Sequence, residues 1–408
     1  MDAFVWTSGR SSRRAHARPV VLELERDSLH PPDEIPTRDM ATTHHCLEIF
    51  AAPHESLSLP EADRRKIFNG ITKSSGPGGF KPGELTHKAE LSWFEEFSVM
   101  AVLLFVVGGP LLILPCLFAC IIFGGWKACL IWLLTVLFLA FHPLPWKKSR
   151  VKGGQNEWEA ALGQSKFTLA VYKYFSYRFV WAGDAKEQCD TAKSAAWIGA
   201  GPPHGVLPFA NLLSIPAINT FGYRHFLGGG ASVVAHTPFL RYMTWYGFIE
   251  VSAKSITKAL DEGSCVGLVP DGIAGIFRCT AEDEVVVLKK RKGIAKLALR
   301  TGHPIVPAYS IGNTAAFSAW FDPFGILERL SRAAQASFFV YWGRYYLPIP
   351  RRANITMLLG PPIKVEKVAE PTDAQVDEVH ERLLKEMKEL FDTHKAACGW
   401  AEKKIIFE

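Results

Sequence analysis

Trp197-Ile198-Gly199-Ala200-Gly201-Pro202-Pro203-His204-Gly205 is the stretch of sequence that decides how this chain folds. Its apolar part, Ala196–Gly199, predicts a short buried strand. The two prolines fix φ and the final glycine frees it, so a turn is predicted to end the strand. His204 lies in this turn. Imidazole titrates near neutral pH, so His204 is a candidate for taking a proton from a hydroxyl group and returning it. A surface histidine in an ordinary turn is the alternative.

Short apolar runs and helical segments alternate along the rest of the chain after residue 150. Further strands are predicted at Ala231–Ala235, Cys265–Val269, Val285–Leu288, Ile305–Ser310 and Ile355–Leu359. Helices are predicted at Phe239–Tyr246, Ser255–Asp261 and Lys292–Arg300, and a capping box at Thr372-Asp373-Ala374-Gln375 opens a last packing helix. This alternation predicts an α/β fold with a mostly parallel sheet flanked by helices.

A long uncharged segment precedes this domain. No residue is charged from Phe97 to Trp126, and after Lys127 the apolar run resumes from Ala128 to Phe141. The first run alone would form about 45 Å of helix, longer than the roughly 30 Å hydrocarbon core of a bilayer. Glycine and proline interrupt it, so residues 91–150 are predicted to form a transmembrane or re-entrant helical hairpin. Basic residues follow and predict that both ends face the cytoplasm: Lys147, Lys148, Arg150 and Lys152.

Length and composition bound the remaining organisation. The 408 residues suffice for a large core, with residues 1–90 predicted to be largely disordered and 151–408 to form one cytosol-facing domain. The basic run 10–18 is typical of a disordered arm or of an organelle transit peptide. The net charge of +6 suits anionic lipid or phosphorylated substrates, whereas nucleic acid is not expected because no basic stripe is interleaved with aromatic residues. The eight cysteines lack metal-site spacing, so neither a metal site nor a disulfide framework is predicted.

Three further places carry candidate chemistry. Asp271 and Gly272 follow the predicted strand Cys265–Val269, where the carboxyl ends of parallel strands form a ligand crevice, although an Asp-Gly turn needs no function. Arg241 follows Pro238 and could reach a phosphate or be solvated or ion-paired. The basic run 289–293 precedes a helix, which favours anion binding, with a solvated loop or a patch against anionic lipid as the alternative.

Taken in order, these segments resemble the type-2 diacylglycerol acyltransferase family, which includes monoacylglycerol and wax-alcohol acyltransferases. The resemblance covers about residues 91–408. Pro202-Pro203-His204-Gly205 is similar to the family's His-Pro-His-Gly, and 268–274 to its Pro-Gly-Gly block. Arg291-Lys292-Gly293, followed by Pro304-Ile305-Val306-Pro307 and later Gly360-Pro361-Pro362-Ile363, matches further blocks of the family.

The resemblance implies a glycerolipid-acyltransferase-like fold and an acyl-CoA-dependent O-acyltransferase that esterifies diacylglycerol to triacylglycerol. His204 would be the general base, with Asp271 as the second catalytic residue. The residues expected to bind substrate are Pro203, Gly205, Asn211, Arg241, Gly272, Arg291, Lys292 and Gly293. No cofactor or metal is expected, and acyl-CoA is the co-substrate, with its phosphates near the basic run.

The resemblance also implies partners and a location. These are diacylglycerol, acyl-CoA and membrane lipid, with homo-oligomerisation left open, at the endoplasmic-reticulum membrane or lipid droplets with the catalytic domain in the cytosol. Two alternatives remain at this point. One is transfer to monoacylglycerol or a wax alcohol, and the other is a non-catalytic, hairpin-anchored lipid-binding protein of lipid droplets.

The chain departs from the family pattern at the positions that matter for catalysis. Pro202 replaces the first His or Glu of the motif. Asp271 stands where the family often has Gly, and Gly275 where it often has Glu, so the carboxylate has moved to 271 or its function is absent. Phe209 stands where lysophosphatidate acyltransferases have Asp, while Asn211 is polar and could help to position His204.

Overall fold

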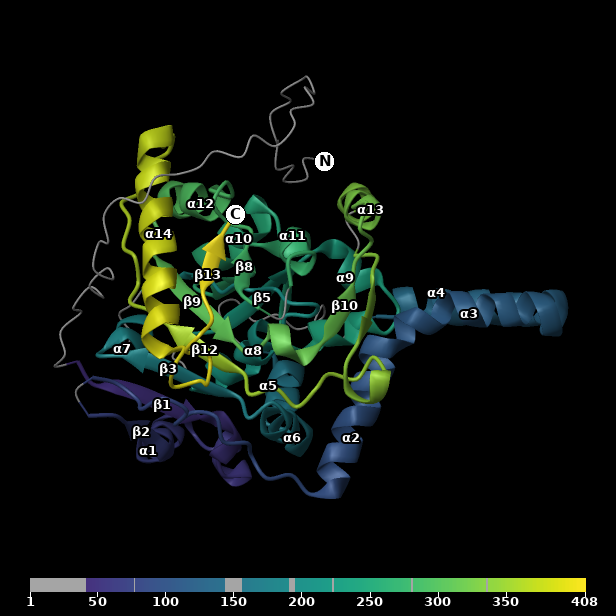
Figure 1. The fold of residues 1–408 in the computed structure, drawn as a ribbon, viewed down its shortest axis with the longest axis horizontal. Coiled ribbons are helices and arrows are strands. Elements are labelled where there is room, and N and C mark those ends of the chain that lie inside the picture. Colours follow the sequence, from purple (N-terminus) through teal and green to yellow (C-terminus); the bar gives the residue numbers. More distant parts are fainter. Residues whose placement is uncertain are drawn as a thin grey trace, which may run out of the picture.

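The computed structural model describes residues 42–76, 78–143, 156–190, 195–221, 224–279, 282–334 and 337–408. The basic run 10–18 and the four basic residues at 147–152 lie outside these ranges. The centre of the molecule is a nine-stranded mixed sheet with the order β2-β1-β3-β12-β9-β4-β7-β5-β6, covered by helices (Figure 1). Two small two-stranded sheets, β10-β11 and β13-β8, lie beside it.

The strands of the large sheet are β1 (His44–Glu48), β2 (Thr72–Ser74), β3 (Arg178–Ala182), β4 (Ile198–Ala200), β5 (Phe226–Gly230), β6 (Phe248–Glu250), β7 (Cys265–Leu268), β9 (Ile305–Ile311) and β12 (Thr356–Leu359). The small sheets contain β8 (Glu284–Val286), β10 (Ser318–Trp320), β11 (Val340–Trp342) and β13 (Ile405–Phe407). The helices are α1 (Glu61–Ile71), α2 (Trp93–Leu103), α3 (Gly109–Ala119), α4 (Gly125–Phe141), α5 (Glu157–Gly163), α6 (Lys166–Tyr174), α7 (Ala185–Asp190), α8 (Phe209–Phe221), α9 (Ser232–His236), α10 (Ala253–Asp261), α11 (Gly272–Ile276), α12 (Gly293–Thr301), α13 (Ile326–Ala334) and α14 (Asp373–His394).

The large sheet has a parallel and a mixed half. From β9 through β4, β7 and β5 to β6, each strand pairs parallel with the next. In the other half, β12 pairs antiparallel with β9, and β1 pairs antiparallel with both β2 and β3. Because β12 pairs parallel with β3, five of the eight pairings in the sheet are parallel, so the sheet is mixed but mostly parallel, and it is purely parallel from β9 to β6. The prediction that residues 1–90 are disordered is wrong for the described part, because β1, β2 and α1 complete the sheet and its cover.

One strand prediction was wrong, and another strand lies outside the large sheet. Ala231–Ala235 is the short helix α9, and the strand is β5, which ends in Gly228-Gly229-Gly230. Glycine has low strand propensity and hides such a strand from pattern reading. Here a Cβ at these glycines would collide with Ile215, Leu268 and Phe248, so only glycine lets these side chains pack. The predicted strand Val285–Leu288 is β8, which pairs with β13 outside the large sheet.

Helices cover both faces of the sheet. α10, α12 and α14 pack on one face, against β6, β7, β4, β9 and β12, and α8 packs on the other with α5 and α6 beyond it (Figure 1). The capping box predicted at Thr372 is present at the start of α14. The predicted helices Ser255–Asp261 and Lys292–Arg300 are α10 and α12, whereas Phe239–Tyr246 is a 3-10 helix over Leu240–Tyr246 rather than an α-helix.

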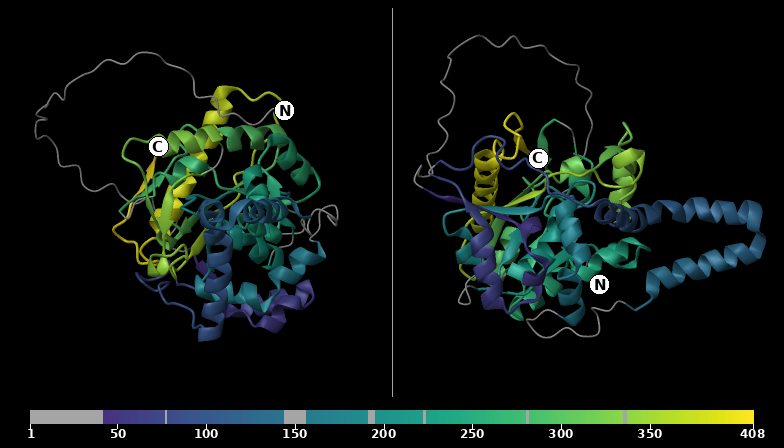
Figure 2. Two further views of the ribbon diagram at one scale, coloured as in Figure 1. Left: turned by 90° about the vertical axis from the view of Figure 1, so that its right-hand side faces the viewer. Right: turned by 90° about the horizontal axis from the view of Figure 1, so that it is seen from below.

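The apolar segment forms a continuous helical stretch, Trp93–Phe141, that is long and apolar enough to cross a membrane. Its first part, α2, packs on α6, while α3 and α4 project from the body as two arms (Figure 2). The arms join at Gly125, where φ is +63°, and Trp132 Nε1 donates to Ile113 O across them at 3.1 Å. At the body, Gly109 and the Phe105 ring pack on Phe239. Placement of the arms in a membrane stays a prediction.

Candidate active site

Three adjacent parallel strands end at the same edge of the sheet and bring the candidate residues together. β4 lies between β7 and β9, with parallel pairing on both sides. His204 follows β4, Asp271 follows β7, and Asn313 follows β9. Because carboxyl ends of parallel strands share one edge, Asp271 and Asn313 become neighbours of His204 although they lie 67 and 109 positions after it in the chain. The structure thus joins the His204 and Asp271 predicted from separate motifs.

The His204 imidazole is half-buried and held by its own turn. Its Nδ1 lies 2.9 Å from the carbonyl oxygen of Gly205. A carbonyl only accepts hydrogen bonds, so Nδ1 carries the hydrogen and Nε2 keeps its lone pair in the neutral ring. Nε2 has no partner among the described residues. Gly205 has φ at +61°, which favours glycine, and its missing Cβ leaves room for Asn313.

Asp271 is fully buried beside His204 but does not bind the imidazole. Its Oδ2 accepts the main-chain N–H of His204 at 2.9 Å, and its Oδ1 is buried without a partner among the described residues. Burial raises the pKa of Asp271, against the opposing effects of the His204 charge and main-chain N–H and of Arg291. The carboxyl group therefore positions the turn through the backbone.

Gly275 explains why the carboxylate can stand at 271. A Cβ built on Gly275 would collide with Oδ2 and Cγ of Asp271 and come within 2.8 Å of its Cβ. The Asp271 side chain therefore occupies the space that a side chain at 275 would need. The two departures from the family pattern form one matched pair, in which a carboxylate at 271 requires glycine at 275.

Two residues that sequence reasoning missed hold the turn from β9. Asn313 Nδ2 donates to Pro203 O at 3.2 Å and to His204 O at 2.8 Å, while its Oδ1 accepts the N–H of Ala210 at 3.1 Å. Ser310 Oγ donates to Pro202 O at 3.2 Å. A signal was present, since a polar residue directly after a central parallel strand lies at the ligand edge.

Two predicted substrate-binding residues have structural partners instead. Asn211 Nδ2 donates to Gly201 O at 2.8 Å, at the end of β4, and does not contact the His204 ring. Arg241 is buried, and its guanidinium donates to Leu139 O and His142 O at 2.9 Å at the end of α4. Main-chain carbonyls of the arm hold the Arg241 guanidinium, and its binding of a phosphate stays a prediction.

Two residues of the basic run point to different parts of the molecule: Arg291 toward the site and Lys292 toward α14. Arg291 Nη1 donates to Pro270 O at 3.4 Å and lies beside Gly272, whose φ is +45°. Arg291 is thus next to Asp271. Lys292 instead forms an ion pair with Asp377 of α14. This ion pair is part-exposed, and binding of a substrate by Lys292 stays a prediction.

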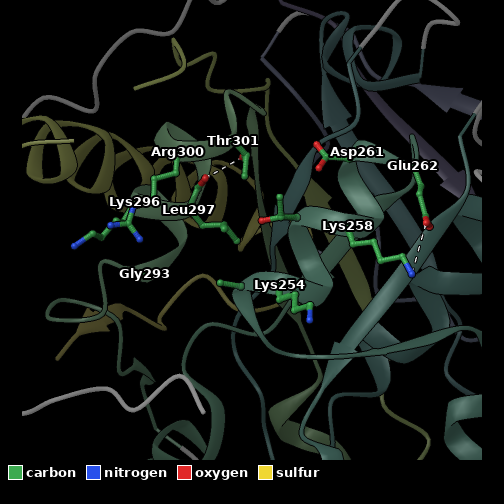
Figure 3. Close-up of a pocket in the computed structure, with 11 residues that line it drawn as sticks. Lys254, Lys258, Asp261, Glu262, Gly293, Lys296, Leu297, Arg300 and Thr301 are labelled. Carbon is green, nitrogen blue, oxygen red and sulfur yellow. Dashed lines mark hydrogen bonds and ion pairs between the residues drawn. The ribbon is translucent and has the colours of Figure 1, made fainter. Parts of the chain in front are cut away.

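A cavity of about 690 Å³ begins at Gly293 and runs between α10 and α12 (Figure 3). Its basic lining residues are Lys254, Lys258, Lys296 and Arg300, and its acidic ones are Asp261 and Glu262. Lys258 pairs with Glu262, whereas Lys254, Lys296 and Arg300 have no ion-pair partner among the described residues. Across the part of the chain that the structure describes, no group of three His, Cys, Asp or Glu side chains could hold a metal ion.

The pattern of an imidazole and a buried carboxyl at the ends of central parallel strands is that of an acid–base site in an α/β enzyme. Residues 127–407 match the family model described as diacylglycerol acyltransferase. The chain belongs to this family and is an acyltransferase. This membership decides against a non-catalytic lipid-binding protein.

Known proteins similar to this chain carry related names. Diacylglycerol O-acyltransferase 2-like protein 6 of Bos taurus is 26% identical over 295 residues, covering 66% of this chain and 85% of that protein. 2-acylglycerol O-acyltransferase 1 of Bos taurus is 24% identical over 304 residues, covering 67% and 85%. Among solved structures, the 1-acyl-sn-glycerophosphate acyltransferase of Thermotoga maritima aligns with a TM-score of 0.34 at 15% identity, covering 71% of this chain and 95% of that one.

Proposed function

We propose that the protein transfers the acyl group of an acyl-CoA to the free hydroxyl of diacylglycerol, giving triacylglycerol, with His204 as general base. The observation that carries this proposal is the half-buried His204 ring, whose Nδ1 is held by Gly205 O and whose Nε2 is left free. Nε2 takes the hydroxyl proton while the hydroxyl oxygen attacks the thioester carbonyl. A C–O bond forms, the C–S bond breaks, and the imidazolium returns the proton to the departing thiolate.

Asp271 acts in this scheme as a positioning residue. It fixes the main chain at His204, and its carboxylate form stabilises the imidazolium by charge from close range. Arg291 shares this environment and is half-buried beside the Pro270 carbonyl. Its charge favours the ionised carboxyl, against the burial that raises the pKa of Asp271.

The phosphates of acyl-CoA are placed at Arg291 and in the cavity between α10 and α12. The cavity begins at Gly293, two residues beyond Arg291, and so leads away from the His204 edge. Three cationic side chains without carboxylate partners line it, and phosphate groups favour such a setting. In this proposal these cations, rather than Lys292, hold the phosphates.

The arms α3 and α4 would insert in the endoplasmic-reticulum membrane or a lipid droplet, with the body on the cytosolic side. Their apolar side chains are exposed, as at Phe118 of α3, which is 60% exposed. Exposed apolar surface on this scale is typical of helices that contact lipid. Diacylglycerol dissolves in that lipid, so the anchor also places the enzyme beside its acceptor.

The test is acyl transfer in microsomes from a host that lacks neutral-lipid synthesis. Labelled acyl-CoA is offered with diacylglycerol, monoacylglycerol or a long-chain alcohol. We expect label in triacylglycerol, and loss of a general base in His204→Ala should lower the rate about 100- to 10,000-fold. His236→Ala, at an exposed ring bound to Ser232 O, is the matched control and should keep the rate.

The outcomes separate the parts of the proposal. If product forms only from monoacylglycerol, or only from the alcohol, that compound is the acceptor in place of diacylglycerol. Retained activity in His204→Ala, with the variant still in the membrane fraction, would overturn the base assignment. A wild type without product from any acceptor would contradict the proposed reaction.

A further inference from the structure

Helix α13 is amphipathic, but its orientation is inverted relative to a soluble protein. Ile326 and Leu330, one turn apart, are 59% and 51% exposed. On the opposite side of the helix, the Glu328 side chain is 19% exposed and Ser331 is fully buried. A surface helix normally buries its apolar face and exposes its polar face. In α13 the apolar face points outward.

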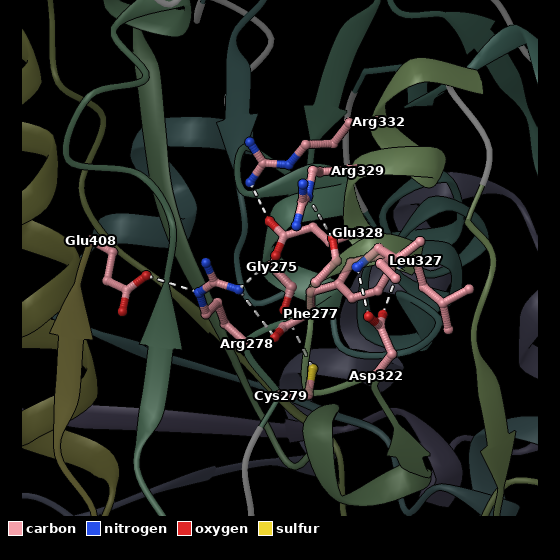
Figure 4. Close-up of polar contacts among 12 residues, drawn as sticks. Gly275, Phe277, Arg278, Cys279, Asp322, Leu327, Glu328, Arg329, Arg332 and Glu408 are labelled. Atoms are coloured by element: carbon pink, nitrogen blue, oxygen red, sulfur yellow. Dashed lines mark hydrogen bonds and ion pairs between the residues drawn. The ribbon is translucent and has the colours of Figure 1, made fainter. Parts of the chain in front are cut away.

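Specific bonds hold the polar face of α13 against the body. Arg278, just beyond α11, donates to Glu328 at 3.1 Å and to Glu408 at 3.0 Å (Figure 4). Ser331 Oγ accepts the N–H of Phe338 at 2.8 Å. Asp322 caps the helix by accepting the N–H groups of residues 326 and 327. Rotating the helix to bury Ile326 and Leu330 would break the contact of Glu328 with Arg278 and that of Ser331 with Phe338. These two contacts therefore fix the orientation of the helix.

The exposed apolar surface extends beyond the helix. α13 connects β10 to β11, and Trp320 of β10 lies directly opposite Val340 of β11, so these two side chains share a face. Both are exposed, as is Phe324 before the helix at 74%. We call the five residues the outer patch: Trp320, Phe324, Ile326, Leu330 and Val340. The patch lies within one segment of chain, 318–342.

The outer patch belongs to the side of the body from which the arms project. Figures 1 and 2 show α13 near the root of α3 and α4 in perpendicular views. α2 lies on the same side, and its Trp93, Phe94 and Phe97 are exposed as well. The apolar surface of the arms therefore continues on the body itself.

We propose that the outer patch lies on a phospholipid surface, with α13 as an interfacial helix beside the inserted arms. A lipid surface is favoured as the occupant because the patch combines tryptophan and aliphatic side chains with the exposed Arg329, which suits the headgroup boundary of an anionic leaflet, while Arg332 is paired with Glu328. The inference rests on the proposed insertion of α3 and α4 but not on catalysis. α13 packs on α11, whose N-cap is Asp271, so the lipid surface would lie one helix away from the site.

The test places a photoreactive amino acid, p-benzoylphenylalanine, at position 330 of the full chain in vesicles of phosphatidylcholine and phosphatidylserine. Irradiation should give a phospholipid adduct, detected by mass spectrometry. The matched control is position 385, an exposed residue of α14 on the far side of the body, which should give none. No lipid adduct at 330, or an adduct to a second copy of the chain, would overturn the proposal.

A rate measurement adds a second readout. Leu330→Glu should lower the rate on long-chain diacylglycerol in vesicles about tenfold, because a charge at the lipid boundary disfavours docking. Its rate on a short-chain acceptor dispersed in detergent should stay that of the wild type. Equal rates in vesicles would contradict the proposal. If the wild type shows no acyl transfer at all, the proposed function fails, and the adduct at 330 still decides the lipid contact.

Discussion

The edge of the sheet at β4, β7 and β9 differs from the arms α3 and α4 in which chemical groups each one buries. At the edge, the Asp271 carboxyl is fully buried and Asn313 is nearly so. In the arms, large apolar side chains such as Phe118 and Phe138 face outward. Each region reverses the arrangement expected in water. At the edge, main-chain hydrogen bonds compensate the reversal, whereas in the arms a lipid environment would have to do so.

This difference teaches that the two regions respond to different changes. A substitution at the edge acts through position and charge, and it should leave the arms in the membrane. A substitution in the arms acts through the environment and should leave the geometry at His204 unchanged. Arg241 bonds the end of α4 to the body, so a substitution there should act on how the arms are held.

Among the changes that leave His204 in place, the largest effect is expected from the matched pair at the edge. Gly275→Glu forces the Asp271 side chain out of its position, and a shift of about 1 Å at a catalytic group costs about 100-fold in rate. Combining Gly275→Glu with Asp271→Gly, the residues frequent in relatives, should recover part of that loss. Acyl transfer in microsomes measures both variants.

The control for this pair is Gly70→Glu, where a Cβ meets nothing within 4 Å. It should leave the rate unchanged, and all variants should stay in the membrane fraction. A single Gly275→Glu variant as active as the wild type would show that the Asp271 carboxyl has no positioning role.

An intermediate effect is expected where the arms join the body. Arg241→Leu leaves the carbonyls of Leu139 and His142 without their donor, which costs about 1–3 kcal/mol for a buried acceptor. Thermal unfolding in detergent should show the loss. Arg382→Leu, at an exposed position of α14, is the matched control and should change little. If both variants unfold alike, Arg241 does not join the arms to the body.

The smallest effect concerns pH. Burial raises the pKa of Asp271 above its unfolded value of about 3.9, so the folded protein binds more protons between these two values. The free energy of unfolding should therefore fall as pH rises through this window, by about 1.4 kcal/mol for each pKa unit of the shift. Asp271→Asn cannot titrate and should lack this fall.

Thermal unfolding from about pH 4 to about pH 8 measures the difference between Asp271→Asn and the wild type, which should grow in favour of the variant as pH rises. Asp377→Asn, at a part-exposed carboxylate, is the control. Parallel curves for wild type and Asp271→Asn would contradict a raised pKa.

Local patterns in the sequence predicted much of this edge. β7, β9 and β12 are continuous apolar runs, and the glycines and prolines after β4 and β7 mark where the chain turns. Because parallel strands end together, His204 and Asp271 could be expected at one edge. Their mutual contact, through the main-chain N–H rather than the ring, depends on side-chain orientation that no local pattern carries.

The partners of charged side chains could not be predicted in the same way. Arg241 is held by residues about a hundred positions earlier, and Lys292 by Asp377 on another helix. Asn313 was missed because its role is to bind carbonyls that only the folded sheet brings near. β5 was missed because three of its five residues are glycine, which is uncommon in strands. These glycines leave room for neighbouring side chains.

Phe239 and Arg241 together hold both roots of the arm pair, the first at Gly109 and Phe105 and the second at the end of α4. The stretch between these roots is thus attached to the body at two points and could be exchanged as one unit. Evolution or a protein engineer could exchange it for arms of another length, suited to a thinner or thicker bilayer, provided that the small residue at 109 and the final carbonyls were kept. Relatives could in this way change organelle without changing chemistry.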